Sequence, residues 1–256
     1  MMMTQARAPR GAVGHLRILG VRVDDVTEGE ALDRIEAFIQ EGTPHQVVTV
    51  NPEFVVMAQQ DRTFMDILNS ADLSLPDGVG LLWAARTLGR PLRERVAGSD
   101  LVYRLAQLAE ARGHSIYLLG AGHGIGLKAA ERLVRRRPGL RVAGAYPGSP
   151  RPEEDAEIVG RIRAASPQIL LVAFGAPAQD RWIRRNLELL GVPVSIGVGG
   201  ALDFVSGKVR RAPVWVRKLG IEWLFRLAME PWRWRRMLRL PRFAIMVLRQ
   251  RIWQSA

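Results

Sequence analysis

Residues 169–174 read ILLVAF, a continuous apolar run that follows Ser166 and Gln168 and ends at Gly175. A run of this length without alternating polar residues is typical of a strand whose two faces are both buried. Strands of that kind occur in parallel sheets that carry helices on both sides. The run therefore predicts an interior strand over residues 168–174.

Strands and helices alternate regularly around this run. Further strands are expected at 115–119, 140–145 and 194–198, and helical patterns lie between them at 124–137, 153–165 and 178–190. Connections through helices place successive strands parallel to one another. The pattern predicts an α/β fold, with a Rossmann-like parallel sheet and helices on both of its faces.

The N-terminal part of the chain adds more elements to this sheet. Thr27 and Glu30 stand three residues apart as a capping box and predict a helix that ends at about Gln40. Ser99 or Asp100 is expected to cap another helix. The other expected elements are strands at 15–23, 46–50 and 72–76, and helices at 53–60, 63–69, 78–88 and from residue 99 or 100 to 112.

The composition is that of a folded protein without thiol chemistry. The 256 residues are 48% hydrophobic and 24% charged, and none is a cysteine. This is enough apolar sequence for one large α/β domain, and the lack of cysteine excludes disulfides and fits a reducing compartment. The basic N-terminus lacks the apolar core of a secretory signal, and apolar runs such as 243–248 are too short to span a bilayer. We therefore expect a cytoplasmic protein.

The net charge of +12 is concentrated at the C-terminal end. Residues 208–256 contain 13 Lys and Arg residues against only Glu222 and Glu230, a net charge of +11, together with five of the seven tryptophans. The sequence therefore predicts an α/β domain over 1–207 and a basic, tryptophan-rich helical appendage over 208–256. Two prolines, Pro231 and Pro241, are expected to divide this appendage into short helices.

A carboxylate directly follows one of the predicted strands. Residues 72–80 read DLSLPDGVG, in which the apolar run ends at Pro76, Asp77 follows, and Gly78 opens the next helix. Ligands of open α/β sheets bind beyond the carboxyl ends of the strands, and glycine there lets the chain turn sharply and a ligand approach closely. Asp is also a favoured N-cap. Asp77 is therefore either a group that faces a ligand or the cap of helix 78–88.

Two more strands end in glycine-rich turns. Residues 119–126 read LGAGHGIG and open a helix, an arrangement that holds phosphate on a helix N-terminus. The sixth position of the G-x-G-x-x-G pattern is not glycine, so a dinucleotide site is not expected, and a tight turn without a ligand is the alternative. Together with the glycines of 197–200, these turns predict one crevice in which Gly78, Gly120 and Gly122 contact the substrate.

Sites that commonly carry metal or hydrolase chemistry are absent from the sequence. The four histidines are scattered, and no two aspartates stand two residues apart, so neither a histidine cluster nor a D-x-D element is present. No serine has the glycine neighbours of a G-x-S-x-G elbow. Metal-dependent and serine-hydrolase chemistry are therefore disfavoured, and no cofactor is expected.

The order and spacing of several segments resemble one bacterial enzyme family. The segments, between about residue 16 and residue 243, are TVNPEFVVMAQQD, LSLPDGVGLLWAARTLGRP, ERVAGSDL, YLLGAG, FGAPAQDRWI and GVGGALDFVSGKVRRAPVWVRKLGIEWLFRLAMEPWR. Together they are similar to the WecG/TagA/CpsF family of glycosyltransferases. The resemblance implies a metal-independent, inverting transferase that moves a sugar from a UDP-sugar to a polyprenyl-diphosphate-linked sugar, in cell-surface polysaccharide or teichoic acid-type synthesis. In some members the donor is UDP-N-acetylmannosamine or its uronic acid, and the acceptor is undecaprenyl-diphosphate-linked N-acetylglucosamine.

The resemblance also implies roles for residues of this chain. The general base falls on Asp77 and a second catalytic residue on Arg95. The substrate-binding positions fall on Thr49, Asn51, Gln179, Arg226, Arg233 and Arg236. Taken from its own segment alone, Gln179 fits a solvated first-turn residue equally well. Ala178 and Asp180 stand where many members have Lys and Glu, which puts the donor sugar in question more than the reaction type.

The chemistry of such a transfer agrees with these residues. Displacement at an anomeric carbon needs a carboxylate to take the acceptor's proton, and it needs positive charge on the departing diphosphate, which arginines supply without a metal. A basic segment rich in tryptophan is expected to lie on an anionic membrane surface, here the inner face of the cell membrane.

The alternative is a basic nucleic-acid-binding α/β protein, because the interleaved Arg and Trp of WRWRR also fit that class. A salt-dependent gel shift compared with liposome flotation separates the two classes. The sequence leaves the oligomeric state open, including a homo-oligomer.

Overall fold

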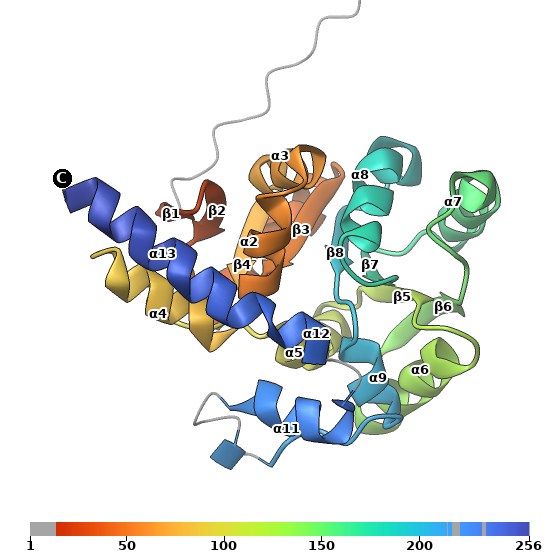
Figure 1. Ribbon diagram of the computed structural model, residues 1–256. Coiled ribbons are helices and arrows are strands. Elements are labelled where there is room, and N and C mark those ends of the chain that lie inside the picture. Colours follow the sequence, from red (N-terminus) through yellow and green to blue (C-terminus); the bar gives the residue numbers. More distant parts are fainter. Residues whose placement is uncertain (1–13, 214, 217–220, 232–233, 256) are drawn as a thin grey trace, which may run out of the picture.

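A parallel sheet of six strands forms the centre of the molecule (Figure 1). The structure is a computed structural model and describes residues 14–213, 215–216, 221–231 and 234–255. In pairing order, the strands are β4 (Leu73–Pro76), β3 (His45–Val50), β8 (Val194–Gly197), β7 (Ile169–Ala173), β5 (Ser115–Gly120) and β6 (Arg141–Tyr146). Every adjacent pair in this sheet is parallel. The predicted Rossmann-like α/β fold is therefore confirmed.

Helices cover both faces of this sheet. One face packs against α1 (Glu28–Glu41), α5 (Gly98–Arg112), α6 (Ile125–Arg136) and α9 (Ala201–Ser206). The other face packs against α2 (Pro52–Ala58), α3 (Arg62–Ser70) and α4 (Val79–Thr87) near β3, and against α7 (Asp155–Ala165) and α8 (Ala178–Leu190) near β7. A short 3-10 helix, η1 (Pro152–Glu154), leads into α7.

Strand β7 shows why the ILLVAF run is apolar throughout. Ile169 and Leu171 belong to the apolar cluster on the α1 and α5 side, whereas Leu170 and Val172 belong to the cluster on the α7 and α8 side. All four side chains are fully buried. Because successive side chains of a strand point to opposite faces, a strand covered on both sides needs an apolar residue at every position.

The prediction of a single strand over 15–23 is wrong, because this segment is a hairpin. Its strands, β1 (His15–Ile18) and β2 (Val21–Asp24), pair in antiparallel fashion and form a separate small sheet. The turn consists of Leu19 and Gly20, with φ values of 49° and 81°. Glycine favours this left-handed conformation, but leucine rarely adopts it, so the sequence hides half of the turn.

Helix α1 begins where the sequence predicts. The Thr27 hydroxyl accepts a hydrogen bond from the Glu30 backbone N–H, and the Glu30 carboxylate accepts one from the Thr27 N–H. Both halves of the predicted capping box are therefore present.

Helix α5 does not begin as predicted. It starts at Gly98, so Ser99 and Asp100 lie inside its first turn and neither is its cap. Both side chains instead accept hydrogen bonds from Arg211, which lies 111 residues or more further along the chain. A partner so distant in sequence is invisible to a rule based on local capping patterns.

The C-terminal segment returns to the body of the protein. Its described helices are α11 (Glu222–Met229), α12 (Trp234–Met237) and α13 (Arg239–Ser255). Helix α13 runs along α2 and α4 (Figure 1), and its Phe243 and Val247 are buried in the apolar cluster there. Pro241 lies in the first turn of α13, where proline is tolerated, so it does not separate two helices as predicted. A domain boundary at residue 207 stays a prediction.

Candidate functional site

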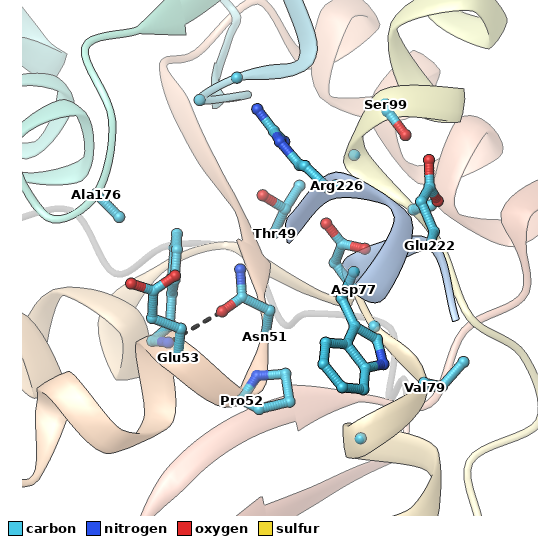
Figure 2. Close-up of a pocket in the computed structure, with 18 of the residues that line it drawn as sticks. Thr49, Asn51, Pro52, Glu53, Asp77, Val79, Ser99, Ala176, Glu222 and Arg226 are labelled. Carbon is cyan, nitrogen blue, oxygen red and sulfur yellow. Dashed lines mark hydrogen bonds between the residues drawn. The ribbon is translucent and has the colours of Figure 1, made fainter. Parts of the chain in front are cut away.

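A cleft of about 520 Å³ opens beyond the carboxyl ends of β4, β3, β8 and β7. The residues that follow these strands form its floor, and its walls come from the first turns of α4 and α5 and from α11 (Figure 2). The start of α13 adds a further wall. The predicted site residues that line the cleft are Thr49, Asn51, Asp77, Gly78, Arg95, Gln179 and Arg226. The fold therefore brings together side chains that are widely separated in the sequence.

Asp77 stands at the sharp turn between β4 and α4. Its backbone N–H donates to the Val50 carbonyl at 2.7 Å, which continues the pairing of β3 with β4. Gly78 follows with φ of 102°, a conformation that other residues rarely adopt, and a Cβ there would lie 3.4 Å from Pro52 Cδ. Gly78 itself is the N-cap of α4, and no side chain caps this helix. The structure therefore does not support Asp77 as the cap of α4, and its carboxylate lies on the cleft.

The surroundings of the Asp77 carboxylate make it bind a proton more readily than usual. Withdrawal from bulk water is the main cause that raises the pKa of Asp77 from 3.8 to about 6, and the negative charges of Glu222 and Asp100 add to this effect. The positive charge of Arg95 and a hydrogen bond from the Gly98 backbone act in the opposite direction on this pKa. Such a carboxylate is ionised at neutral pH and is still a better proton acceptor than an ordinary aspartate, as a general base requires.

Thr49 and Asn51 come from β3, the neighbour of β4. Thr49 Oγ1 donates to the Gly197 carbonyl at 3.1 Å and thereby links β3 to β8 beneath the cleft. The Thr49 side chain and the Asp77 carboxylate meet at Gly98, where an added Cβ would lie 3.4 Å from Thr49 Cγ2 and 3.5 Å from Asp77 Oδ2. Asn51 Oδ1 accepts a hydrogen bond from the α2 backbone at 3.0 Å, while its amide nitrogen points into the cleft (Figure 2). Asn51 is therefore a helix cap as well as a cleft residue.

Gln179 is buried and is not a solvated first-turn residue. Its side chain is 1% exposed, and its Oε1 accepts a hydrogen bond from the Gly199 N–H at 2.9 Å. Asp180 is fully buried behind it, and burial raises the pKa of Asp180 to about 7, against hydrogen bonds from its own backbone and from the Gln179 amide. Both side chains pack on Gly197, where a Cβ would lie 2.6 Å from Gln179 Nε2 and 2.7 Å from Asp180 Oδ1. Because residue 197 is glycine, the side chains of Gln179 and Asp180 both fit at this strand end.

Arg226 reaches the cleft from α11. The carbon of its guanidinium group lies 4.5 Å from the centroid of the Phe204 ring, and its Nε donates to Glu230 Oε2 at 2.8 Å. A Cβ at Gly200 would lie 2.7 Å from Arg226 Nη2. The glycine that follows β8 therefore lets the guanidinium approach the cleft floor closely.

Four predicted site residues are not placed on this cleft. Arg233 and the side chain of Arg236 lie outside the described residues. Gly120 is the last residue of β5 and Gly122 follows it, and neither is among the residues that line the cleft, because β7 lies between β5 and β8. Gly120 has φ of 95°, and a Cβ there would lie 2.8 Å from the Ala173 carbonyl carbon. The close contact between β5 and β7 therefore explains why residue 120 is glycine without any need for a ligand, in line with the alternative of a tight turn.

Several other side chains line the cleft that the sequence did not reveal, among them Trp83, Phe204, Glu222 and Trp223. Glu222 did carry a signal, because it is one of only two acidic residues among residues 208–256. A carboxylate in so basic a segment suggests a specific partner. In the structure that partner is Arg211, whose Nε lies 3.5 Å from Glu222 Oε1.

Three helices begin at the cleft without a side-chain cap. Helices α4, α5 and α8 start after Gly78, Ala97 and Pro177, and in the described structure none of these positions forms a side-chain capping bond. The backbone N–H groups of a first turn carry partial positive charge. Together with Arg95 and Arg226 they make the cleft suitable for phosphate groups. Among the described residues, no group of three or more His, Asp or Glu side chains could hold a metal ion.

Nearly the whole chain matches one protein family. The model of the glycosyl transferase WecG/TagA/CpsF family matches residues 16–256. A protein of Bacillus subtilis (strain 168) is 36% identical over 205 residues, which are 80% of this chain and 79% of that protein. A protein of Staphylococcus aureus (strain MRSA252) is 31% identical over 233 residues, 90% of each chain. Both relatives are named N-acetylglucosaminyldiphosphoundecaprenol N-acetyl-beta-D-mannosaminyltransferase. Since the match includes every residue of the cleft, the chain belongs to the WecG/TagA/CpsF family of glycosyl transferases.

Proposed function

We propose that this glycosyltransferase moves N-acetylmannosamine, or a closely related sugar, from a UDP-sugar to a polyprenyl-diphosphate-linked N-acetylglucosamine. The names of the relatives supply the sugar and the acceptor. In this chain, the observation that carries the proposal is Asp77, a carboxylate of raised pKa in a cleft that also contains Arg95 and Arg226. Family membership favours this reaction over the alternative of a nucleic-acid-binding protein.

In this proposal Asp77 is the general base. The acceptor hydroxyl attacks the anomeric carbon of the donor sugar and gives its proton to the Asp77 carboxylate. The bond between the anomeric carbon and the diphosphate oxygen breaks, and its electron pair leaves with UDP. A single displacement of this kind inverts the anomeric carbon. A hydrogen bond from the Gly98 backbone N–H holds the carboxylate in place for this step.

The leaving diphosphate needs positive charge, and the cleft supplies it from the protein. Arg95 and Arg226 line the cleft, and the first turns of α4, α5 and α8, which lack side-chain caps, begin at it. Guanidinium groups bind phosphate oxygens through two parallel hydrogen bonds, which compensates the charge that develops on the leaving group. We therefore infer that the reaction proceeds without a divalent cation.

A polyprenyl acceptor would bring the reaction to a membrane surface. None of the described helices has both the length and the apolar content needed to cross a bilayer. Val79, Trp83 and Trp223 line the cleft and are 39%, 40% and 41% exposed, so its rim offers apolar side chains to lipid. We infer peripheral binding at the inner face of the cell membrane, with the basic residues of 208–256 attracted to anionic headgroups.

The test is acceptor-dependent release of UDP together with the mass of the product. Candidate donors are UDP-N-acetylmannosamine, its uronic acid, UDP-N-acetylglucosamine and UDP-glucose, each with a synthetic short-chain lipid diphosphate that carries N-acetylglucosamine. We expect the fastest transfer from UDP-N-acetylmannosamine and the same rate in excess EDTA. Transfer from none of these donors would contradict the proposed reaction. A rate that collapses in EDTA and returns with Mg²⁺ would contradict metal independence.

A further inference from the structure

Arg211 joins the first turns of two helices beside Asp77. Its Nη2 donates to Asp100 Oδ2 at 2.7 Å and to Ser99 Oγ at 2.9 Å, both in α5. Its Nε lies 3.5 Å from Glu222 Oε1, at the start of α11. The side chains of Arg211 and Glu222 are each only 18% exposed, so salt screens this pair less than it screens a surface pair. Arg211 therefore connects the body of the protein to α11 close to the reacting carboxylate.

Two contacts with the body of the protein anchor α11. None of the eight residues of α11 is fully buried, so its polar contacts matter more for its placement than they do for a helix of the core. Its beginning is anchored by the pair of Glu222 with Arg211, and its second turn by Arg226 against Phe204. Figure 2 shows Glu222 and Arg226 on the wall of the cleft above Asp77.

The groups that face Asp77 come from several parts of the chain. They are Thr49 from β3, Arg95 from the loop before α5, Gly98 and Asp100 from α5, and Glu222 and Arg226 from α11. Asp100 belongs to a long, well-buried helix of the body. Glu222, in contrast, comes to Asp77 only with α11. The placement of α11 therefore decides whether a second negative charge stands near the reacting carboxylate.

We propose that Glu222 is a positioning residue for the reaction: Arg211 holds it on the wall of the cleft, where its carboxylate places a negative charge beside Asp77 when α11 covers the cleft. This inference rests on the proposed role of Asp77. A negative neighbour disfavours the ionised form of a carboxylate, so Glu222 raises the pKa of Asp77, as Asp100 also does. Removing Glu222 from the wall leaves a weaker base. Transfer of the acceptor's proton to Asp77 is therefore favoured when α11 covers the cleft.

The pH dependence of kcat/KM tests this inference with the full-length protein and a short-chain soluble acceptor. Glu222→Gln removes the charge and keeps the size of the side chain. We expect the midpoint of the acidic limb to move down by roughly 0.5–1 pH unit. At pH 8, where Asp77 is ionised in both proteins, turnover should fall severalfold because the base is weaker. Glu188→Gln, which removes an exposed charge from α8, is the matched control and should leave the limb in place.

The contribution of Arg211 is tested in a second background. With Arg211→Gln, Glu222 is no longer held, so adding Glu222→Gln should shift the limb by less than half as much as in the wild type. Arg211→Lys keeps the charge and should retain more of the shift, and melting temperatures confirm that all variants are folded. Equal shifts in the wild-type and Arg211→Gln backgrounds would overturn the role given to Arg211.

Two outcomes separate failure of this inference from failure of the proposed function. If Asp77→Asn keeps normal turnover, Asp77 is not the base and the proposed mechanism fails. If Asp77→Asn abolishes turnover, but Glu222→Gln only raises the KM for the acceptor without moving the limb, the mechanism stands. In that case Glu222 is a binding residue and the inference is overturned.

Discussion

The turns after β4 and β5 look alike in sequence and differ in what surrounds them. Each has a glycine of positive φ at the end of its strand or shortly after it, Gly120 at 95° and Gly78 at 102°, and each leads into a helix. After β4 the turn also carries Asp77 and lies on the cleft. After β5 the glycine is pressed against the β7 backbone and the turn does not line the cleft. Glycine at the end of a strand therefore indicates a turn, and the surroundings of that turn in the fold decide whether it can contact a ligand.

The order of strands explains this difference. Strands β4, β3 and β8 are neighbours, so the residues that follow them share one edge of the sheet. The C-terminal segment adds α11 and α13 to the same half, where they supply Arg226 and close the cleft on one side. The turns that follow β5 and β6 are not among the described residues that line the cleft. One half of the edge is thus enclosed enough to bind a substrate.

Asp77→Asn should give the largest effect of any substitution in the β4 turn. The amide cannot take the acceptor's proton, so turnover should fall by roughly 10²–10⁴-fold. The melting temperature should not fall, because the substitution keeps the shape of the side chain. UDP release at pH 8 with the short-chain acceptor is the measurement. Turnover close to that of the wild type would reduce Asp77 to a turn residue, and the two turns would then no longer differ in chemistry.

Arg226→Glu tests whether α11 completes the cleft on this half of the sheet. The substitution reverses the charge that faces the diphosphate, and we expect turnover to fall by about 10- to 100-fold. A soluble short-chain acceptor is used, so that weaker membrane binding cannot explain the loss. The matched control is Arg249→Glu, on the exposed side of α13. Normal turnover with reduced liposome binding would make α11 a membrane anchor only, and would leave Arg95 and the helix N-termini to balance the charge.

The sequence predicts the sheet well because its signals are local. Continuous apolar runs mark the interior strands, and β7 is apolar at each position because both of its faces are covered. The hairpin at the N-terminus is missed because Leu19 adopts a conformation that leucine rarely takes. The site is predicted only in part, because its walls depend on strand order and on contacts between distant segments. Glu222 approaches Asp77 from 145 positions further along the chain, and no local pattern contains that contact.

Asp180→Asn separates a structural carboxylate from a reactive one on the same half of the sheet. Burial raises the pKa of Asp180 from 3.8 to about 7, so the folded state holds its proton more tightly than the unfolded state does. The stability that comes from this protonated group is present below pH 4 and is lost as the pH rises through 7. An asparagine side chain does not ionise, so the variant does not lose this stability as the pH rises. The variant should therefore be more stable than the wild type at pH 8, on the order of 1–3 kcal/mol, with nearly equal stability at pH 4.

Denaturant unfolding at the two pH values measures this difference. Asp77 contributes equally to both proteins and cancels from the comparison. Turnover should change little, because Asp180 does not line the cleft. A variant that is less stable than the wild type at pH 8 would show that Asp180 is ionised and paired in the folded protein. A large loss of turnover would show that the Asp180 carboxylate is needed to hold the Gln179 side chain in place for the reaction.

Gly122→Ala should have the smallest effect, and it tests the β5 turn directly. Nothing lies within 4 Å of a Cβ added at Gly122, so the only cost is its φ of 76°, about 1–2 kcal/mol of stability. Turnover at a temperature where the variant is folded should stay within about twofold of the wild type, because strain in a turn away from the cleft does not move the reacting groups.

The matched substitution on the cleft side is Gly200→Ala. Its backbone φ is −75°, which any residue adopts, but the added Cβ would lie 2.7 Å from Arg226 Nη2 and displace the guanidinium. We therefore expect stability close to that of the wild type and turnover reduced severalfold. Gly122→Ala should therefore lose stability and keep its activity, whereas Gly200→Ala should lose activity and keep its stability. If Gly122→Ala instead lost turnover as strongly as Gly200→Ala while fully folded, the β5 turn would contact the substrate after all. The site would then extend across β7, as the glycine pattern of the sequence predicts.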